Sequence, residues 1–421
     1  MADAVAAPSV ATPSAVLPNL DRIIRGLLYV YIFSLPFKRL LFIERNGFII
    51  LIVLLVLWCA VNRRHFFLRT PIDIPLLAFV AWVGFTVPFA TFPAYSSKEF
   101  AKLLQQGLIF YTVVYFFRDP VHRWRLVWML IGELTLVSAY GMWEFMSDHG
   151  TSIYYIESFL PGDAALATYL LMLIPLSAAV ALYLPSGKFR NLTAGATGLS
   201  ILCLFLTYTR AGILAMMAET LAVVWLVRQR RVAFIAGVVI FSLLIGAAGL
   251  LILTKLTSEG SPMMPGSGKF TTYNLEARLN IWLFALKKLE ESPIVGIGFG
   301  KDNFFLVTGT ESSRLSSAAT TVMPAGTHNT FLDVAVGAGI PALLALIWLL
   351  WAIMKEALHQ LRLTEDSLIP MLSLALAAMV VGMCVRNFFD HMWVSILAVQ
   401  FWVLVGLAVF PRSKPLGPSG L

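Results

Sequence analysis

The chain has 421 residues, of which 59% are hydrophobic and only 13% are charged, and its mean hydropathy is +0.81. Soluble domains carry roughly 25% charged residues, so this composition excludes a soluble globular protein. The formal charge of +8 does not indicate nucleic-acid binding, because the basic residues lie between apolar segments, where they set topology and meet lipid headgroups.

The apolar runs often approach the ~20 residues that a helix needs to cross a bilayer. Such runs satisfy their backbone in lipid as helices and not as the alternating strands of a barrel. The sequence therefore predicts an all-α polytopic membrane protein of about twelve transmembrane helices. The predicted spans are 22–40, 46–62, 72–92, 99–117, 124–146, 163–185, 190–208, 211–227, 232–254, 337–355, 368–386 and 392–410.

The predicted organisation follows from these spans and from charge. Of the 31 Lys and Arg residues, seventeen lie in one set of connections and seven in the other, once a loop too long to count is left out. Both termini are therefore expected in the cytoplasm and the long loop outside it. The parts are a disordered tail at 1–20, helices 1–9 in 21–254, the long loop with short helices at 255–336, helices 10–12 in 337–410, and a tail at 411–421.

No metal or cofactor is expected. The three cysteines, Cys59, Cys203 and Cys384, lie inside apolar segments without CxxC spacing, which is typical of small core residues. No His, Cys or carboxylate stands at ligand spacing near His328.

The long loop contains "NLEARLNIWLFALKKLEESP", which predicts a helix whose apolar stripe is Leu275, Leu279, Trp282, Leu286 and Leu289. Arg278 falls on the flank of this stripe. Two interpretations stay open: its guanidinium stacks on Trp282, or it turns towards a buried anionic ligand. The next stretch, "GIGFGKD", matches no nucleotide-binding fingerprint and is expected to be a glycine-rich turn, with a small anion nest as the alternative.

Arg210, in "LTYTRAGILA", follows the seventh span on the extracytoplasmic side. An arginine in hydrocarbon is costly unless it snorkels to the interface. Because nothing in the predicted topology demands a positive charge on this face, a functional role is favoured over an interfacial anchor.

The stretch "PAGTHNTFLDVAVGAGIPALL" places a histidine and an asparagine just before an apolar run. Thr330 and Asp333 fit a capping-box-like helix start, with Thr327 as the other candidate cap. Either choice puts His328 and Asn329 in or just before the first turn of a short helix, and the glycines form a corner before the next span. A helix N-terminus disfavours imidazolium, so His328 is expected to be neutral and able to act as a general base.

Other charged residues are predicted on the same outer face. Arg386 and Asp390 lie at the outer end of the last helical hairpin, and Lys38, Arg39 and Glu144 end the first and fifth spans. Arginines beside a neutral histidine suit a phosphate-bearing lipid, because guanidinium pairs bidentately with phosphate and needs no metal.

Three stretches in this order, "TRAG" closing a span, "RLNIW…SPIVGIGFGKDNF" in the long loop and "HNTFLDVAVGAGIPALL", resemble the O-antigen ligase and polymerase superfamily of bacterial envelope glycosyltransferases. The motifs cover roughly residues 190–355, and the span pattern extends the resemblance to the whole chain.

The resemblance implies a GT-C-type glycosyltransferase of the bacterial inner membrane with a periplasmic active site. Such enzymes take a glycan from undecaprenyl pyrophosphate, without metal or nucleotide sugar, and the ligases join it to lipid A-core oligosaccharide in lipopolysaccharide biosynthesis. By motif, the catalytic histidine falls on His328 and the two pyrophosphate-binding arginines on Arg210 and Arg278. Roles for Asn329, Arg386, Asp390, Lys38, Arg39 and Glu144 are inferred from their positions and not carried over.

Related activities remain alternatives. The O-antigen polymerase and the protein O-oligosaccharyltransferase use similar motifs. A single large outer loop and a chain that ends soon after the last span favour the ligase. A lipid-linked glycan transporter would place ionisable residues near the bilayer midplane, whereas the sequence gathers them at one interface.

Overall fold

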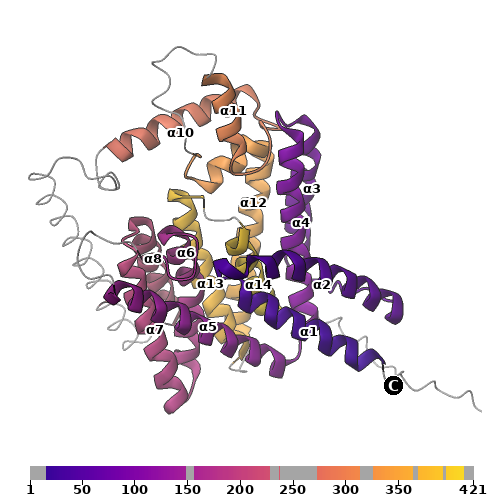
Figure 1. Ribbon diagram of the computed structural model, residues 1–421, viewed down its shortest axis with the longest axis vertical. Helices are drawn as coiled ribbons and strands as arrows, with labels where there is room; N and C mark the ends of the chain where they lie inside the picture. Colours follow the sequence, from indigo (N-terminus) through magenta and orange to yellow (C-terminus); the bar gives the residue numbers. More distant parts are fainter. Residues whose placement is uncertain are drawn as a thin grey trace, which may run out of the picture.

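The computed structural model describes residues 16–147, 156–227, 237, 273–312, 326–363, 368–391 and 395–411, and all secondary structure in them is helical (Figure 1). Eleven of the twelve predicted spans overlap helices, and the predicted span 232–254, apart from residue 237, lies outside the described residues. The elements are α1 (Val16–Ser34), η1 (Lys38–Leu40), α2 (Leu41–Asn62), α3 (Asp73–Thr86), η2 (Val87–Phe89), α4 (Pro93–Phe116), α5 (Pro120–Ser147), α6 (Asp163–Tyr183), α7 (Lys188–Leu206), α8 (Arg210–Val227), α10 (Tyr273–Glu291), α11 (Asn303–Ser312), α12 (Thr330–Leu363), α13 (Leu368–Phe389) and α14 (Ser395–Ala408).

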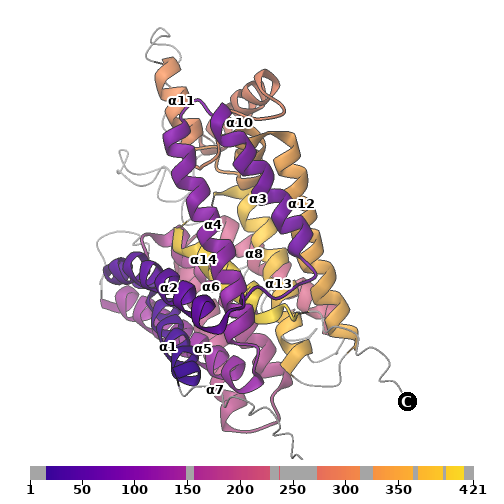
Figure 2. The ribbon, with the colours of Figure 1, turned by 90° about the vertical axis from the view of Figure 1, so that its right-hand side faces the viewer.

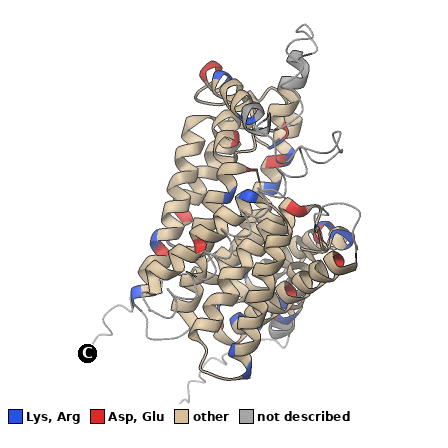
Figure 3. Cartoon of the chain, turned by 90° about the vertical axis from the view of Figure 1, so that its left-hand side faces the viewer, with Lys and Arg blue, Asp and Glu red and all other residues tan. Residues whose placement is uncertain are grey.

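The described helices confirm a polytopic membrane protein. Seven of them are long and apolar enough to cross a membrane, and the segments Asp73–Phe89 and Ser395–Ala408 are apolar but shorter. Much of the length of these helices carries neither acidic nor basic residues (Figure 3). These helices establish the polytopic class, and the count of about twelve spans and the GT-C architecture remain predictions.

The centre of the bundle consists of α6 and α13. The apolar windows of both helices are 78% buried, and α13 packs against α6, α8 and α12. A helix that is apolar on every side is buried all round, which accounts for the central place of these two sequences. On another side of the bundle α12 packs on α3, and α3 contacts α4 (Figure 2).

α10 lies across the end of the bundle above α12 (Figure 1). It packs through Ile281 and Ala285, which are buried. The predicted apolar stripe is therefore only partly the packing face, because Leu279 and Leu286 on it are 48% and 46% exposed. Sequence periodicity found the helix but not the side that faces the protein.

The predicted glycine corner is confirmed as a kink in α12. Gly339 has φ of 84° and ψ of 169°, a conformation open in practice to glycine alone. Pro341 then falls in the first turn after the kink, where its missing N–H costs nothing. α12 is therefore two helical segments, and only the first of them leads back to His328.

The "GIGFGKD" loop docks on this kink. The amides of Ile297 and Gly298 each donate to α12 carbonyls, of Val336 and Gly337, at 2.9 Å. A side chain at Gly296 would collide with the backbone of Gly337, so the glycines permit the close approach. Both amides are already hydrogen-bonded within the protein and cannot also bind an anion. This supports the glycine-rich turn and argues against an anion nest at these two residues.

Two further bonds fasten the kink. The amide of Ile340 donates to the carbonyl of Pro293 at 2.8 Å, and the indole of Trp82 in α3 donates to the carbonyl of Ala338 at 3.0 Å. A backbone amide and a backbone carbonyl next to the kink are thus satisfied by groups outside the helix. Both segments of α12 are thus fastened next to the kink, the first at Ala338 and the second at Ile340.

Candidate active site

The turn before α12 presents His328. Asn329 caps the helix, since its side-chain oxygen accepts from the amide of Leu332 at 3.0 Å, as an N-cap residue does. The predicted capping box of Thr330 and Asp333 is therefore wrong. His328 has a φ of 50°, a left-handed conformation that is uncommon for a residue with a side chain and concentrates at functional sites.

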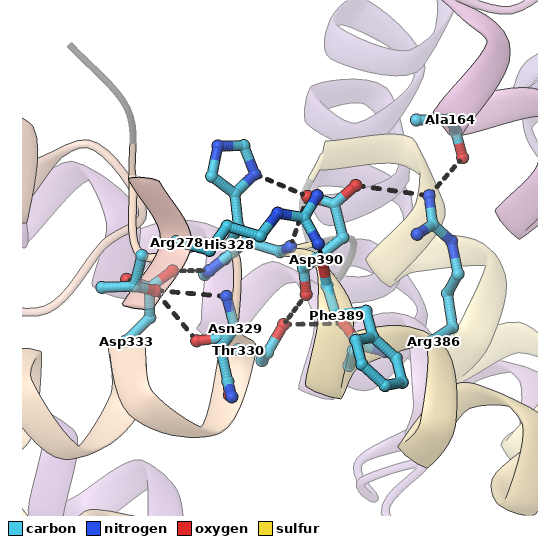
Figure 4. Close-up of polar contacts among 12 residues, drawn as sticks. Ala164, Arg278, His328, Asn329, Thr330, Asp333, Arg386, Phe389 and Asp390 are labelled. Carbon is cyan, nitrogen blue, oxygen red and sulfur yellow. Dashed lines mark hydrogen bonds and ion pairs between the residues drawn. The ribbon is translucent and has the colours of Figure 1, made fainter. Parts of the chain in front are cut away.

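His328 pairs with Asp390, which follows the end of α13. The Nδ1 atom of His328 lies 3.2 Å from the Oδ1 atom of Asp390, and Figure 4 shows the two side chains pointing toward each other. An ionised carboxylate can only accept, so Nδ1 carries the hydrogen and Nε2 keeps its lone pair. The His328 side chain is 39% exposed, so a substrate can reach it.

Arg386 holds Asp390 in place. Its guanidinium lies 3.4 Å from the Oδ2 atom of Asp390, and it also donates to the Thr168 hydroxyl at 3.1 Å and the Ala164 carbonyl at 3.3 Å in α6. The side chain is only 2% exposed. Arg386 was predicted among the residues facing a phosphate, but its hydrogen bonds are to the protein, and they lock Asp390 against the bundle.

The charge state of Asp390 follows from these neighbours. Burial raises the pKa of Asp390, but the hydrogen bond to His328 and the positive charge of Arg386 outweigh it, and the pKa ends below its ordinary value. The carboxylate is therefore ionised at neutral pH. It orients the imidazole and can stabilise a positive charge that appears on the ring.

Arg278, from α10, lies beside the His328–Asp390 pair. Its guanidinium donates to the carbonyl of Phe389 at 3.1 Å, the residue just before Asp390, as Figure 4 shows. Trp282, one turn further, donates from its indole to the carbonyl of Thr327 at 2.8 Å. Helix α10 thus bridges the chain on both sides of the His328–Asp390 pair. Of the two interpretations of Arg278, this contact favours a cation directed at the site.

Arg210 is the first residue of α8 and is exposed. Tyr208, two residues earlier, has a φ of 51°, so the chain turns sharply there. Gly212 lies against Ala167 of α6, next to Thr168, to which Arg386 is bonded. The start of α8 therefore lies at the same end of the bundle as Arg386.

Three residues predicted near the site, Lys38, Arg39 and Glu144, have no contact with the His328–Asp390 pair among the contacts of the described residues. Lys38 pairs with Glu157 at 3.5 Å, and the carboxylate of Glu144 accepts from the amide of Ser158 at 2.7 Å. Arg39 is exposed in η1 beside Lys38. These contacts brace the segment before α6, and they give Lys38 and Glu144 a structural explanation.

Sequence reasoning missed a second histidine–carboxylate pair. Nδ1 of His391 contacts Oδ2 of Asp333, and the hydroxyl of Thr327 donates to Oδ1 of the same carboxylate at 2.6 Å. The pairing is reciprocal, because each of the two crossing segments supplies one histidine and one aspartate. The adjacent letters "DH" after α13 were the only signal in the sequence.

Within the described ranges, no group of three or more His, Cys, Asp or Glu side chains is placed to hold a metal ion. The contacts described above join two imidazoles, two carboxylates and two guanidinium groups.

Residues 195–347 match the family model described as O-antigen ligase. The chain carries an O-antigen ligase domain. The match supports membership of the O-antigen ligase superfamily, whose members are enzymes of the glycosyltransferase or ligase type, as the resemblance of its motifs predicted. No curated protein matches the chain. The O-antigen ligase domain includes Arg210, Arg278 and His328, and Asp390 and Arg386 reach the site from beyond it.

Proposed function

We propose that the protein is an O-antigen ligase. It would transfer a glycan from undecaprenyl pyrophosphate to a hydroxyl of lipid A-core oligosaccharide, at the periplasmic face of the bacterial inner membrane. The observation that carries the proposal is the His328–Asp390 pair, whose Nδ1 and Oδ1 atoms lie 3.2 Å apart. Beside it, the guanidinium of Arg278 donates to the carbonyl of Phe389 at 3.1 Å. A base with its orienting carboxylate stands beside a cation suited to phosphate.

In the proposed reaction His328 is the general base. Its Nε2 atom takes the proton of the acceptor hydroxyl while the oxygen attacks the anomeric carbon of the donor sugar. The bond from that carbon to the pyrophosphate oxygen breaks on the opposite face, so the configuration inverts. Asp390 stabilises the imidazolium that forms, and the lipid pyrophosphate leaves with both electrons of the broken bond.

The arginines have the second task in this proposal. Pyrophosphate is a good leaving group, and the enzyme must hold it and balance the charge that grows on it. Arg278 and Arg210 are assigned to this clamp. Arg386 is instead a positioning residue, because its guanidinium is buried on α6 and Asp390.

The proposed placement in the membrane follows from charge asymmetry. About twelve spans in a GT-C arrangement, with both termini in the cytoplasm, put α10, α11 and the start of α12 outside. The clustering of α10 and α11 at one end of the bundle supports one outer catalytic layer (Figure 2).

Reconstitution tests the proposal. Purified protein in detergent or vesicles is given lipid-linked glycan and lipid A-core, and ligated product is followed by gel mobility. We expect product with wild type, and loss of product in His328→Ala with donor binding retained. The matched control is His65→Ala, at an exposed histidine on the predicted cytoplasmic side. Full activity of His328→Ala would refute the base assignment.

The same assay separates the alternatives through the acceptor supplied. A polymerase would extend a second lipid-linked glycan, a protein oligosaccharyltransferase would modify an added protein, and a transporter would form no glycosidic bond with any acceptor. Product only with lipid A-core supports the ligase.

A further inference from the structure

The two histidine–aspartate pairs belong to different surroundings. His328 and Asp390 lie with Arg386 and Arg278, as described above. His391 and Asp333 line a cavity of about 70 Å³ between α3, α4, α12, α14 and the "GIGFGKD" loop, and neither His328 nor Asp390 is in its wall. The proposed mechanism uses the first pair and gives this cavity no role.

The polar part of the cavity wall is balanced in charge. It holds the carboxylates of Glu99 and Asp333, the ammonium groups of Lys102 and Lys301, the amide of Gln106 and the imidazole of His391. Lys102 lies 2.6 Å from Glu99, and His391 contacts Asp333. A wall with as many acids as bases offers donors and acceptors without the excess of positive charge that a pyrophosphate needs.

The apolar part of the wall includes Phe79, Phe299 and Trp402. Aromatic side chains beside hydrogen-bonding groups of balanced charge are suited to a sugar ring, which presents apolar C–H groups on its faces and hydroxyls at its edge. The surroundings of the His328–Asp390 pair differ, because they contain Arg278 and Arg386, and guanidinium groups bind phosphate.

The cavity is a formed site and not a loose gap. Gly300 lies so close to Glu99 and Tyr95 that a side chain there would collide with both. The hydroxyl of Tyr95 lies 3.2 Å from the carboxylate of Asp302. The loop that closes the cavity is therefore fixed to α4 as well as to the α12 kink.

Thr330 connects the cavity to the catalytic pair. It lines the cavity, and its hydroxyl lies 2.7 Å from the side-chain oxygen of Asn387 and 3.3 Å from the carbonyl of Asp390. Thr330 thus links the cavity wall directly to the residue that pairs with His328.

We propose that this cavity is a subsite for the acceptor oligosaccharide and holds a sugar next to the one whose hydroxyl is glycosylated. The inference rests on the proposed function and deepens it: the pyrophosphate is held beside Arg278, and a neighbouring sugar of the acceptor is held beside His391 and Asp333. His391 and Asp333 are then acceptor-binding residues, and the reciprocal pairing fixes the two subsites relative to each other.

Steady-state kinetics with each substrate varied in turn tests the inference. The variants Gln106→Leu and Lys301→Ala remove groups from the cavity wall, and we expect each to raise the acceptor KM about tenfold, the size of one lost hydrogen bond. The donor KM and kcat are expected within about twofold of wild type on the same reasoning. The matched controls are Gln105→Leu, whose amide bonds Tyr31 and Glu44 instead, and Lys98→Ala, an exposed lysine outside the cavity wall.

The outcomes separate the two proposals. An unchanged acceptor KM in both variants, or a rise in donor KM in its place, overturns the acceptor subsite and leaves the ligase reaction standing. A wild-type protein that glycosylates a different acceptor overturns the ligase proposal, and the same variants are then measured with that acceptor. An unchanged donor KM also shows that the variants are folded.

Discussion

The substitution Asp390→Asn separates orientation of the base from the base itself. It keeps the size of the side chain and removes its charge, so the 3.2 Å contact to His328 and the 3.4 Å contact to Arg386 both lose their ionic partner. A hydrogen bond to a charged group contributes about 1.5–3 kcal/mol. If that stabilisation is realised in the transition state, where the imidazole becomes positive, kcat falls by roughly 10- to 150-fold.

The assay is the reconstituted transfer reaction under donor and acceptor saturation, with the apparent melting temperature measured alongside. Asp390→Asn should also unfold at a lower temperature, because Arg386, only 2% exposed, keeps its charge and loses its counter-ion. Glu290→Gln serves as the control, since Glu290 is an exposed residue of α10 outside the contacts of the His328–Asp390 pair. A kcat equal to wild type in Asp390→Asn, together with an inactive His328→Ala, would refute the view that the carboxylate assists the base.

Three further predictions concern the arginine, the kink and pH. Arg278→Ala should raise the donor KM roughly tenfold or more while the acceptor KM changes little, which two-substrate kinetics measures, and an unchanged donor KM would remove Arg278 from the clamp. Gly339→Ala should lower the apparent melting temperature and the activity, since its φ of 84° costs a residue with a side chain about 1–3 kcal/mol; Gly107→Ala, in a helix with open space around it, should do neither. The lowered pKa of Asp390 means that its stabilisation is present above the ordinary value of about 3.9 and is lost only as pH falls through the lower folded-state pKa. The difference in apparent melting temperature between wild type and Asp390→Asn should therefore stay constant from about pH 7 to pH 5, and a difference that disappears in this range would contradict the assignment.

The sequence predicted the helices well because bilayer length and hydropathy leave few choices. Each apolar run had to form a helix, and the glycines before Pro341 could be recognised as a corner. Packing was less predictable: α10 contacts the bundle through Ile281 and Ala285 although its apolar stripe suggested another face. A helix with apolar residues on two sides does not reveal by periodicity alone which side its neighbours cover.

The site was predicted in part. The structure brings two of the predicted residues to the end of α13, where His328 contacts Asp390 and Arg278 contacts the carbonyl of Phe389. The roles of Arg386 and Asp390 depended on a contact across 62 positions and on hydrogen bonds to α6, which no local pattern encodes. Local reasoning also assigned the helix cap to the wrong residues, because Thr327, Asn329 and Thr330 all have side chains able to cap and only tertiary contacts select one.

The kink at Gly339 is held on both sides. Trp82 donates to the carbonyl of Ala338 before it, and the amide of Ile340 after it donates to the carbonyl of Pro293. The bend is therefore a braced elbow: the angle between the turn that carries His328 and the long apolar segment is set by these two contacts as well as by the backbone of the glycine.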